Sequence, residues 1–424
     1  MGVLGRIPAF VAILVTVGVG GVAQPPDESS DHLPKPTGAF GVGRLTLLCE
    51  DSSRIEPLDS NATPRRIMVD VWYPAERSAS QEAVAAEYLN AAEFERGLGA
   101  ERLKKELGGS YDLIKTGRVT THAVVRAPFA NSLRLAPLLL FSPGGGMIRE
   151  LYTAQMEELA SHGYVVAAMN HSYDGFLTVF PDGSYVEHDG RRWPKIPSFE
   201  GEANLNQLEW HTADILAVLN YLSRLNGAPS PQLPFAGRVD VTRAGAFGHS
   251  FGGVAAAHAC QRDQRIKACL NQDGAMGMKP FYLDAQGWGM NQAFMLIERP
   301  PNHEPLTDSD LSAMKMTRSR AMEFIARLNA DRDRALRSTG TGSYRVLLRR
   351  NVTTHMDFSD LMVLSAKNDI ELEQRMRVLA LVRSYTLAFF DRYVRGMKAP
   401  LLDRSTPDQV LESVEKFSPA SRPN

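Results

Sequence analysis

The sequence predicts an α/β domain with a mostly parallel sheet and helices on both of its faces. Short apolar runs alternate with segments of helical spacing, and one glycine-flanked serine follows a strand pattern and precedes an Ala-rich helix. Alternating strands and helices are typical of parallel sheets covered on both sides. No repeat and no Gly/Ser/Pro-rich linker divides the chain, so we predict one large domain at residues 38–398.

Strands and helices are predicted in a regular order along this domain. Apolar runs predict strands at 44–49, 66–73, 135–141, 164–169, 266–271, 293–297 and 344–348. Helical spacing predicts helices at 149–161, 204–225, 308–337 and 370–396. The pair Asp182-Gly183 indicates a hairpin turn. A charged, Ala/Glu/Leu-rich insertion at about 79–116 is expected as an outer helical layer or a lid, and the tail 399–424 is expected to be loose.

The first residues have the pattern of an export signal. Arg6 precedes an apolar run at 7–19, and Gly21 and Ala23 occupy the −3 and −1 positions of a cut before Gln24. Because the run is short for a membrane-spanning helix, we expect residues 1–23 to be a cleaved signal peptide followed by a flexible leader at 24–37. The predicted location is secreted or otherwise exported.

Composition argues against a strongly charged partner and against a disulfide scaffold. The 424 residues contain 47 Lys and Arg against 48 Asp and Glu, for a formal net charge of −1, so nucleic acid is not an expected partner. The three cysteines form no metal-binding pattern. Cys260 and Cys269 flank one helix-to-strand connection, so they are expected either as a bridge or as two buried thiols.

The central motif is Gly248-His249-Ser250-Phe251-Gly252, which joins an apolar run to the Ala-rich stretch 254–259. Glycine at both flanks leaves room for the close backbone approach of a strained strand-to-helix turn. Such a turn exposes the serine hydroxyl and puts the next N–H at a helix N-terminus, facing any oxyanion that forms on attack. The motif therefore predicts Ser250 as a nucleophile, Phe251 as one oxyanion donor, and an α/β-hydrolase fold.

A serine nucleophile needs a general base, and the base needs an acid that orients it. In this fold the chain order is serine, acid, histidine. Only His303 and His355 follow the motif by more than a helix length, and His303 lies in a proline-rich stretch, so His355 is the predicted base. Asp273 and Glu298 each follow a strand and compete as the acid; Glu298 can be explained as an exposed ion pair with its neighbour Arg299, so the residues alone favour Asp273.

The second oxyanion donor is expected from the loop Ser142-Pro143-Gly144-Gly145-Gly146, which follows the buried run 135–141. We assign it to the Gly145 N–H, with Gly144 and Gly146 as neighbours that could substitute. Ser142 is expected to be structural, and the ring of His249 is expected to pack under the turn. Apolar residues near the same sheet edge could line an acyl pocket or simply pack in the core: Met276, Met278, Phe281, Tyr282, Trp288 and Met356.

These motifs resemble the plasma and type II platelet-activating-factor acetylhydrolases and their microbial relatives, over about residues 38–395. The similar segments are Phe141-Ser142-Pro143-Gly144-Gly145-Gly146, 159–168, Gly248-His249-Ser250-Phe251-Gly252-Gly253 and His355-Met356-Asp357-Phe358-Ser359-Asp360. In that family the acid follows the strand after the Ala-rich helix, and Asp273 occupies this place. Ala275 and Pro143 stand where the family has an aromatic residue and a histidine, and the segment 87–116, apolar in lipoprotein-bound members, is charged here.

The resemblance implies a serine esterase that forms an acyl-serine intermediate on short-acyl (phospho)lipid esters such as platelet-activating factor, and the pattern of residues 1–23 predicts its export. It implies no cofactor and no metal, and a small ester or lipid as the partner. The charged insertion does not support contact with a lipid surface. A general short-chain, polyester or aromatic carboxylesterase is the alternative substrate class, and a non-catalytic binding protein with the same fold is the alternative from another functional class. The sequence does not specify an oligomeric state.

Overall fold

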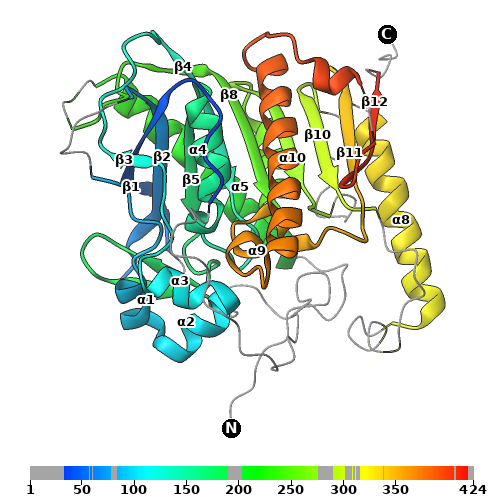
Figure 1. Ribbon diagram of the computed structural model, residues 1–424, viewed down its shortest axis with the longest axis horizontal. Coiled ribbons are helices and arrows are strands. Elements are labelled where there is room, and N and C mark those ends of the chain that lie inside the picture. Colours follow the sequence, from blue (N-terminus) through cyan, green and yellow to red (C-terminus); the bar gives the residue numbers. More distant parts are fainter. Residues whose placement is uncertain are drawn as a thin grey trace.

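One mixed sheet runs through the computed structural model of the protein (Figure 1). The structure describes residues 33–418 except 57, 60, 78–83, 190–202, 229, 231, 276–289, 301–307, 309–310, 312–315, 338 and 405–406. The expected signal peptide, most of the expected leader, and His303 lie outside the described residues.

The sheet has ten strands in the described part of the chain, in the spatial order β12-β11-β10-β9-β8-β4-β5-β2-β1-β3. Their bounds are β1 Gly41–Ile55, β2 Pro64–Ala75, β3 Ala123–Val125, β4 Ala136–Ser142, β5 Val165–Asn170, β8 Val239–His249, β9 Ile266–Gln272, β10 Ala293–Glu298, β11 Ser343–Leu348 and β12 Leu411–Phe417. The neighbours from β11 to β5 are all parallel, whereas β2 pairs antiparallel with both β1 and β5. The carboxyl ends of the parallel strands therefore meet at one edge.

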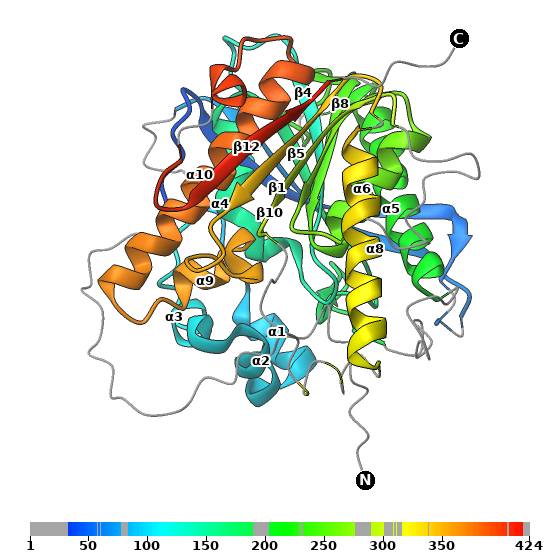
Figure 2. The ribbon, with the colours of Figure 1, turned by 90° about the vertical axis from the view of Figure 1, so that its right-hand side faces the viewer.

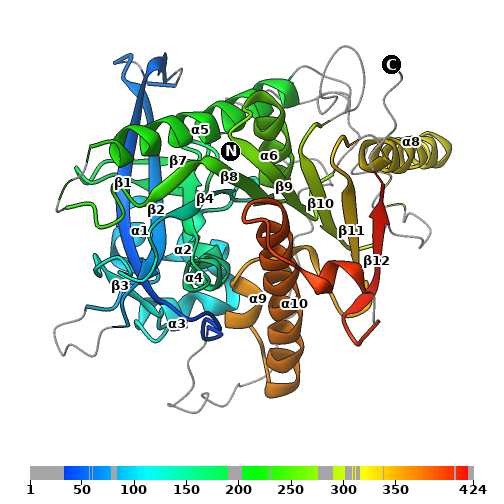
Figure 3. The same cartoon turned by 90° about the horizontal axis from the view of Figure 1, so that it is seen from above.

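Helices cover both faces of the sheet, as the view from above shows (Figure 3). On one face lie α5 (Ala203–Asn226), α6 (Phe251–Arg262) and α8 (Arg318–Arg337); on the other lie α4 (Thr153–Ser161), α9 (Leu361–Leu364) and α10 (Asp369–Tyr393). Strand β4 shows why both layers form. Leu138 and Leu140 belong to the core on the α5 side and Leu139 and Phe141 to the core on the α4 side, because alternate side chains of a strand point to opposite faces. The prediction of an α/β-hydrolase fold is confirmed.

The insertion forms three short helices, α1 (Ala91–Leu98), α2 (Ala100–Leu107) and α3 (Tyr111–Lys115), with the turn η1 (Gly108–Ser110) between the last two. Phe94, Leu103 and Leu107 are buried, so the charged side chains of this segment are left on its outer surface. The hairpin β6 (Leu177–Val179) and β7 (Tyr185–Glu187) contacts α1, and η1 contacts α9. The insertion thus lies at the sheet edge where the parallel strands end (Figure 2).

The expectation of a loose tail at 399–424 is wrong for the residues that the structure describes there. After the turn η5 (Pro400–Asp403), β12 pairs antiparallel with β11 and forms the edge strand of the sheet. The strand predicted at 344–348, which is β11, is therefore followed by one more strand. Few apolar residues mark this segment, because an edge strand has one unpaired side and one solvated face. The helix expected at 308–337 is described as α8 only from Arg318.

A disulfide joins a helix on one face of the sheet to a neighbouring strand. Cys260 and Cys269 form a disulfide between α6 and β9, with Cα atoms 6.2 Å apart. Of the two alternatives that the sequence left open, the bridge is therefore present and the pair of free thiols is not.

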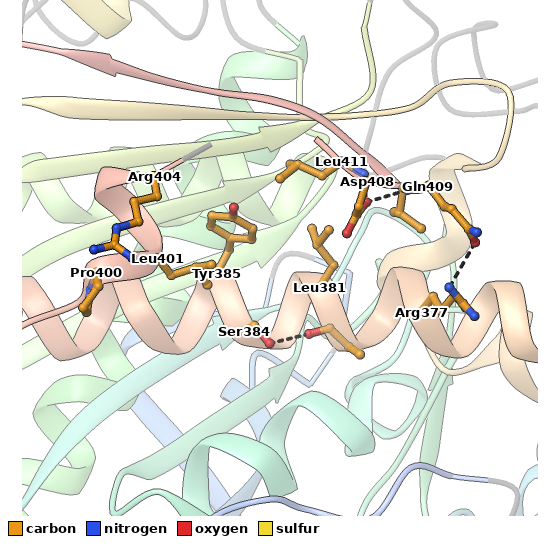
Figure 4. Close-up of a pocket in the computed structure, with 12 residues that line it drawn as sticks. Arg377, Leu381, Ser384, Tyr385, Pro400, Leu401, Arg404, Asp408, Gln409 and Leu411 are labelled. Carbon is orange, nitrogen blue, oxygen red and sulfur yellow. Dashed lines mark hydrogen bonds between the residues drawn. The ribbon is translucent and has the colours of Figure 1, made fainter. Parts of the chain in front are cut away.

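A groove of about 690 Å³ lies along α10 and the segment leading into β12 (Figure 4). None of its lining residues belongs to the loops that carry Ser250, Asp273 or His355. No helix among the described residues is both long and apolar enough to span a membrane.

Candidate active site

Ser250 lies in a strained turn between β8 and α6. Its φ and ψ are +53° and −124°, a conformation that non-glycine residues rarely adopt. The turn is held by the Ser250 N–H, which donates to the Gln272 carbonyl at 2.7 Å, and by the Gly253 N–H, which donates to the Ser250 carbonyl at 3.0 Å. The backbone therefore fixes the direction in which the serine hydroxyl projects.

The glycines that flank the turn are required by close backbone packing. A Cβ at position 252 would lie 2.2 Å from the carbonyl oxygens of Ser142 and Pro143, and one at position 248 would lie 2.5 Å from the Ser142 oxygen. These distances are far below any van der Waals contact. Glycine thus allows the turn to approach the loop after β4, which is the loop expected to carry an oxyanion donor.

The structure brings Ser250, His355 and Asp273 together from three separate strand ends. His355 begins the turn η4 (His355–Phe358) after β11; its Nε2 lies 3.0 Å from Ser250 Oγ and its Nδ1 lies 2.6 Å from Asp273 Oδ2. Asp273 follows β9 directly and has φ +55°. The order hydroxyl, imidazole, carboxylate is the arrangement in which a histidine can accept the serine proton.

Asp273 is held as an anion by two neighbours. Burial opposes its ionisation, but the hydrogen bond and charge of His355, together with the charge of Arg299, lower the pKa of the carboxyl group below its usual value. Arg299 donates from its backbone N–H at 3.1 Å and from Nε at 2.9 Å. An ionised carboxylate only accepts hydrogen bonds, so His355 Nδ1 carries a proton and donates to Asp273, while Nε2 faces the Ser250 hydroxyl.

Glu298, the competing acid, has a different set of partners. Its carboxylate is buried and bonds Arg345 Nε at 2.6 Å and Arg332 at 3.3 Å. The exposed pair with Arg299 that the sequence suggested is therefore wrong, because Arg299 contacts Asp273 instead. Sequence reasoning missed Arg299 as a partner of the acid, although its position just after β10 puts it at the same sheet edge.

The loop 142–146 holds two of its three glycine N–H groups in hydrogen bonds. The Gly144 N–H donates to Tyr152 Oη at 3.2 Å, and the Gly146 N–H donates to Asp174 Oδ2 at 3.4 Å. Within the described residues no acceptor is paired with the Gly145 N–H. A Cβ on Gly145 would meet Phe251 Cβ at 3.7 Å, so these two residues are neighbours. The geometry favours Gly145 over Gly144 and Gly146 as a donor.

Phe251, the other expected donor, is the first residue of α6. Its N–H therefore lies at the positive end of the helix dipole and next to Ser250. Gly145 lies against Phe251, so both expected donors are close to the turn that carries Ser250. Such an arrangement of donors can stabilise negative charge that develops on a carbonyl oxygen.

A second serine, histidine and aspartate set lies beneath the loop. Ser142 Oγ is 2.8 Å from His171 Nε2, and His171 Nδ1 is 2.9 Å from Asp214 Oδ2. All three side chains are buried, and Asp214 also accepts from Arg65. The expectation that Ser142 is structural agrees with this position. Sequence reasoning did not consider His171, because it precedes the nucleophile in the chain.

Five of the six apolar residues that could line an acyl pocket lie outside the described residues. Met276, Met278, Phe281, Tyr282 and Trp288, proposed as pocket residues, all lie in the undescribed segment 276–289. Met356 lies in η4 beside His355 and is half-buried. No group of three or more His, Cys, Asp or Glu that could hold a metal ion was found in the described part of the chain.

Comparison with known proteins adds a family and a structural neighbour. The family described as "Platelet-activating factor acetylhydrolase, isoform II" matches residues 27–299. A probable 1-alkyl-2-acetylglycerophosphocholine esterase of Arthroderma benhamiae is 29% identical over 58% of this chain and 60% of its own length. A platelet-activating factor acetylhydrolase of Cavia porcellus is 26% identical over 57% of this chain and 55% of its own length. The matches thus span little more than half of these relatives.

The structural neighbour covers more of the chain. A ferulic acid esterase from Streptomyces cinnamoneus superposes with a TM-score of 0.62 and 28% sequence identity, over 89% of this chain and 96% of the esterase. The similarity therefore extends over more of the chain than the segment 27–299 that the family model matches.

Proposed function

Because the chain belongs to the platelet-activating factor acetylhydrolase, isoform II, family, we propose that it is a serine hydrolase of carboxylic esters. The observation that carries this proposal is the continuous contact from Asp273 through His355 to Ser250, with hydrogen bonds of 2.6 and 3.0 Å. A serine hydroxyl is a weak nucleophile at neutral pH, and this contact supplies the base that activates it.

The reaction proceeds in two halves. Ser250 Oγ attacks the ester carbonyl carbon while His355 Nε2 takes its proton, and the carbonyl oxygen becomes an oxyanion that accepts from the Gly145 and Phe251 N–H groups. The intermediate collapses, the alcohol leaves with the proton from His355, and an acyl group stays on Ser250. Water then attacks the acyl carbon with His355 again as the base. The bond from this carbon to Ser250 Oγ breaks, Ser250 takes the proton back from His355, and the carboxylic acid leaves. Asp273 keeps the imidazole in the productive tautomer throughout.

Two substrate classes have support. The family and the curated relatives favour short-acyl phospholipid esters such as platelet-activating factor. The structural neighbour favours aromatic esters such as those of ferulic acid. We place the phospholipid ester first, since the family match includes the segments of Ser250 and Asp273.

A substrate panel tests the function and the ranking together. Turnover would be measured on p-nitrophenyl esters of increasing acyl length, on a phosphatidylcholine with a short sn-2 acyl chain, and on methyl ferulate, with Ser250→Ala as the matched control. We expect hydrolysis of the short-acyl phospholipid and a loss of at least about 10⁴-fold in kcat for the variant on every substrate. Equal turnover by wild type and variant would exclude the mechanism, and preference for methyl ferulate would reverse the ranking.

We also propose that the protein is exported, with residues 1–23 as the removed signal. The support is the sequence pattern alone, since these residues lie outside the described part of the structure. Sequencing the N-terminus of the protein recovered from its host would find Gln24 first, and an intact Met1 would contradict the cleavage.

A further inference from the structure

A buried chain of hydrogen bonds joins the oxyanion loop to the loop of the base. It runs from the Gly144 N–H to Tyr152 Oη at 3.2 Å, from Tyr152 Oη to His249 Nδ1 at 2.9 Å, and from His249 Nε2 to the His355 carbonyl oxygen at 2.9 Å. The four residues come from four different segments: the loop after β4, the turn η2 (Arg149–Tyr152), the end of β8, and η4. The mechanism above uses none of these atoms.

Only one placement of protons satisfies every member of this chain. A carbonyl oxygen can only accept, so His249 carries its proton on Nε2. Burial and the neighbouring His355 hold the pKa of His249 well below its usual value, so the ring is neutral and Nδ1 is an acceptor. The Tyr152 hydroxyl must then donate to Nδ1, and its oxygen accepts from Gly144. The direction of donation is therefore fixed from one end to the other.

Buried aromatic rings pack around this chain of hydrogen bonds. Tyr152 and His249 are buried, and the His249 ring packs against the rings of His355, at a centroid distance of 4.6 Å, and Phe358, at 5.5 Å. A Cβ on Gly144 would come within 3.1 Å of His249 Nδ1, so a side chain there would push against the ring. The low dielectric of such a site strengthens each hydrogen bond.

We propose that Tyr152 and His249 are positioning residues that set the Gly145 oxyanion donor relative to the His355 base. Gly145 lies between the two anchored N–H groups of Gly144 and Gly146, so its direction depends on where Gly144 is held. The same chain of hydrogen bonds ends on the carbonyl oxygen of His355. The Gly145 loop and the backbone of the His355 base are therefore held by one continuous set of contacts. This inference rests on the proposed esterase function.

The test uses variants that cut the chain at known links. Tyr152→Phe removes the acceptor of Gly144 and the donor to His249. His249→Gln keeps an N–H near the Nε2 position and loses the acceptor for Tyr152, whereas His249→Asn keeps an acceptor near Nδ1 and loses the donor to His355. Tyr164→Phe is the matched control, because Tyr164 is equally buried and its hydroxyl donates a single bond of 2.8 Å, to Asp391 on α10.

We expect Tyr152→Phe and both His249 variants to lower kcat by about 10- to 100-fold with KM within about twofold, the cost of a misplaced catalytic group. Affinity for an aryl trifluoromethyl ketone, whose Ser250 adduct carries an oxyanion, should fall by the same factor as kcat/KM. Tyr152→Phe/His249→Gln should lose no more than the larger single variant, because both cut the same link. Tyr164→Phe should stay within about twofold of wild type in both measurements, whatever its melting temperature.

Losses that multiply in the double variant, or an equal loss in Tyr164→Phe, would overturn the proposal. The tautomer of His249, read from ¹⁵N shifts of histidine-labelled protein, gives a result that does not depend on ester turnover. A proton on Nε2 is expected, and a proton on Nδ1 or on both nitrogens would also overturn it. An inactive wild type with the expected tautomer would instead refute the esterase function and leave the hydrogen-bond chain standing.

Discussion

The protein contains two serine, histidine and aspartate sets of nearly equal geometry and opposite surroundings. In Ser250, His355 and Asp273 the two contacts measure 3.0 and 2.6 Å; in Ser142, His171 and Asp214 they measure 2.8 and 2.9 Å. The His355 side chain is 28% exposed, whereas that of His171 is 1% exposed. Contact distances alone therefore do not distinguish a reactive site from a structural one.

The backbone and the charges around each set supply the distinction. Ser250 lies in a strained turn at the start of a helix, while Ser142 is the last residue of β4 and pairs in register with Gly248. Asp273 has Arg299 as its cation, whereas Asp214 is the centre of a buried cluster with Arg54 and Arg65. We call Ser250, His355 and Asp273 the upper set, and Ser142, His171 and Asp214 the lower set. The upper set is partly exposed, whereas the buried lower set links β4 and the residue after β5 to α5.

The largest expected difference comes from replacing the two aspartates. Asp273→Asn should lower kcat by about 10⁴-fold, because an amide stabilises the wrong tautomer of His355. Asp214→Asn should instead lower the free energy of unfolding by about 3–5 kcal/mol, because it leaves the buried Arg65 with Glu56 as its remaining carboxylate at 2.6 Å. Ester hydrolysis and urea unfolding of both variants measure the two effects.

Folded Asp214→Asn protein should keep kcat within a few-fold of wild type, because no atom of Asp214 contacts the upper set. The comparison fails if this variant loses activity as Asp273→Asn does while its unfolding free energy is unchanged. Such a result would make the lower set part of the catalytic machinery.

The pH dependence of stability offers a second, smaller contrast. Burial, with His211 stacked on the ring, lowers the pKa of His171 to about 4 from an ordinary 6.5. The unfolded chain therefore binds a proton between pH 6.5 and 4 that the folded protein does not, and the folded protein loses stability as the pH falls through this window. The contribution is at most about 3 kcal/mol.

His171→Asn isolates this contribution, because asparagine does not titrate and its amide can still donate to Asp214. Urea unfolding at pH 7 and pH 4.5 should show a smaller loss of free energy on acidification in the variant than in wild type. A buried histidine that does not contact residue 171, such as His258, contributes equally to both proteins and cancels in the difference. Parallel losses in the two proteins would show that His171 does not titrate in this range.

The upper set could be anticipated from the sequence, and the lower set could not. Ser250, Asp273 and His355 each follow a strand of a parallel sheet, so their meeting at one edge follows from strand order. Asp214 lies in the middle of α5, and only the packing of that helix on the sheet brings it to His171. The expected chain order of serine, acid and histidine also limited the candidate bases to histidines after Ser250, and His171 precedes Ser250 in the sequence.

Most of the fold followed from apolar periodicity, and the exceptions have a common cause. β12 reads Leu-Glu-Ser-Val-Glu-Lys-Phe, in which polar residues outnumber apolar ones, so its strand conformation comes from pairing with the open edge of β11. Glu298 likewise gave no local sign that Arg332 and Arg345 would surround it. The local sequence pattern predicts little where contacts with residues distant in the sequence determine a segment's conformation or a side chain's partners.

The smallest expected effect separates the two serines. Ser142→Ala removes the hydroxyl that donates to His171 Nε2 and leaves a buried acceptor without its partner, so we expect unfolding to become easier by about 2 kcal/mol. Its kcat should stay within a few-fold of wild type, because the Gly144 and Gly146 attachments of the loop are untouched. Urea unfolding and ester kinetics beside Ser250→Ala measure both, and Ser250→Ala should show the reverse pattern, inactive but nearly as stable. A Ser142→Ala protein as inactive as Ser250→Ala would mean that the buried hydroxyl takes part in the reaction, and the distinction by exposure would fail.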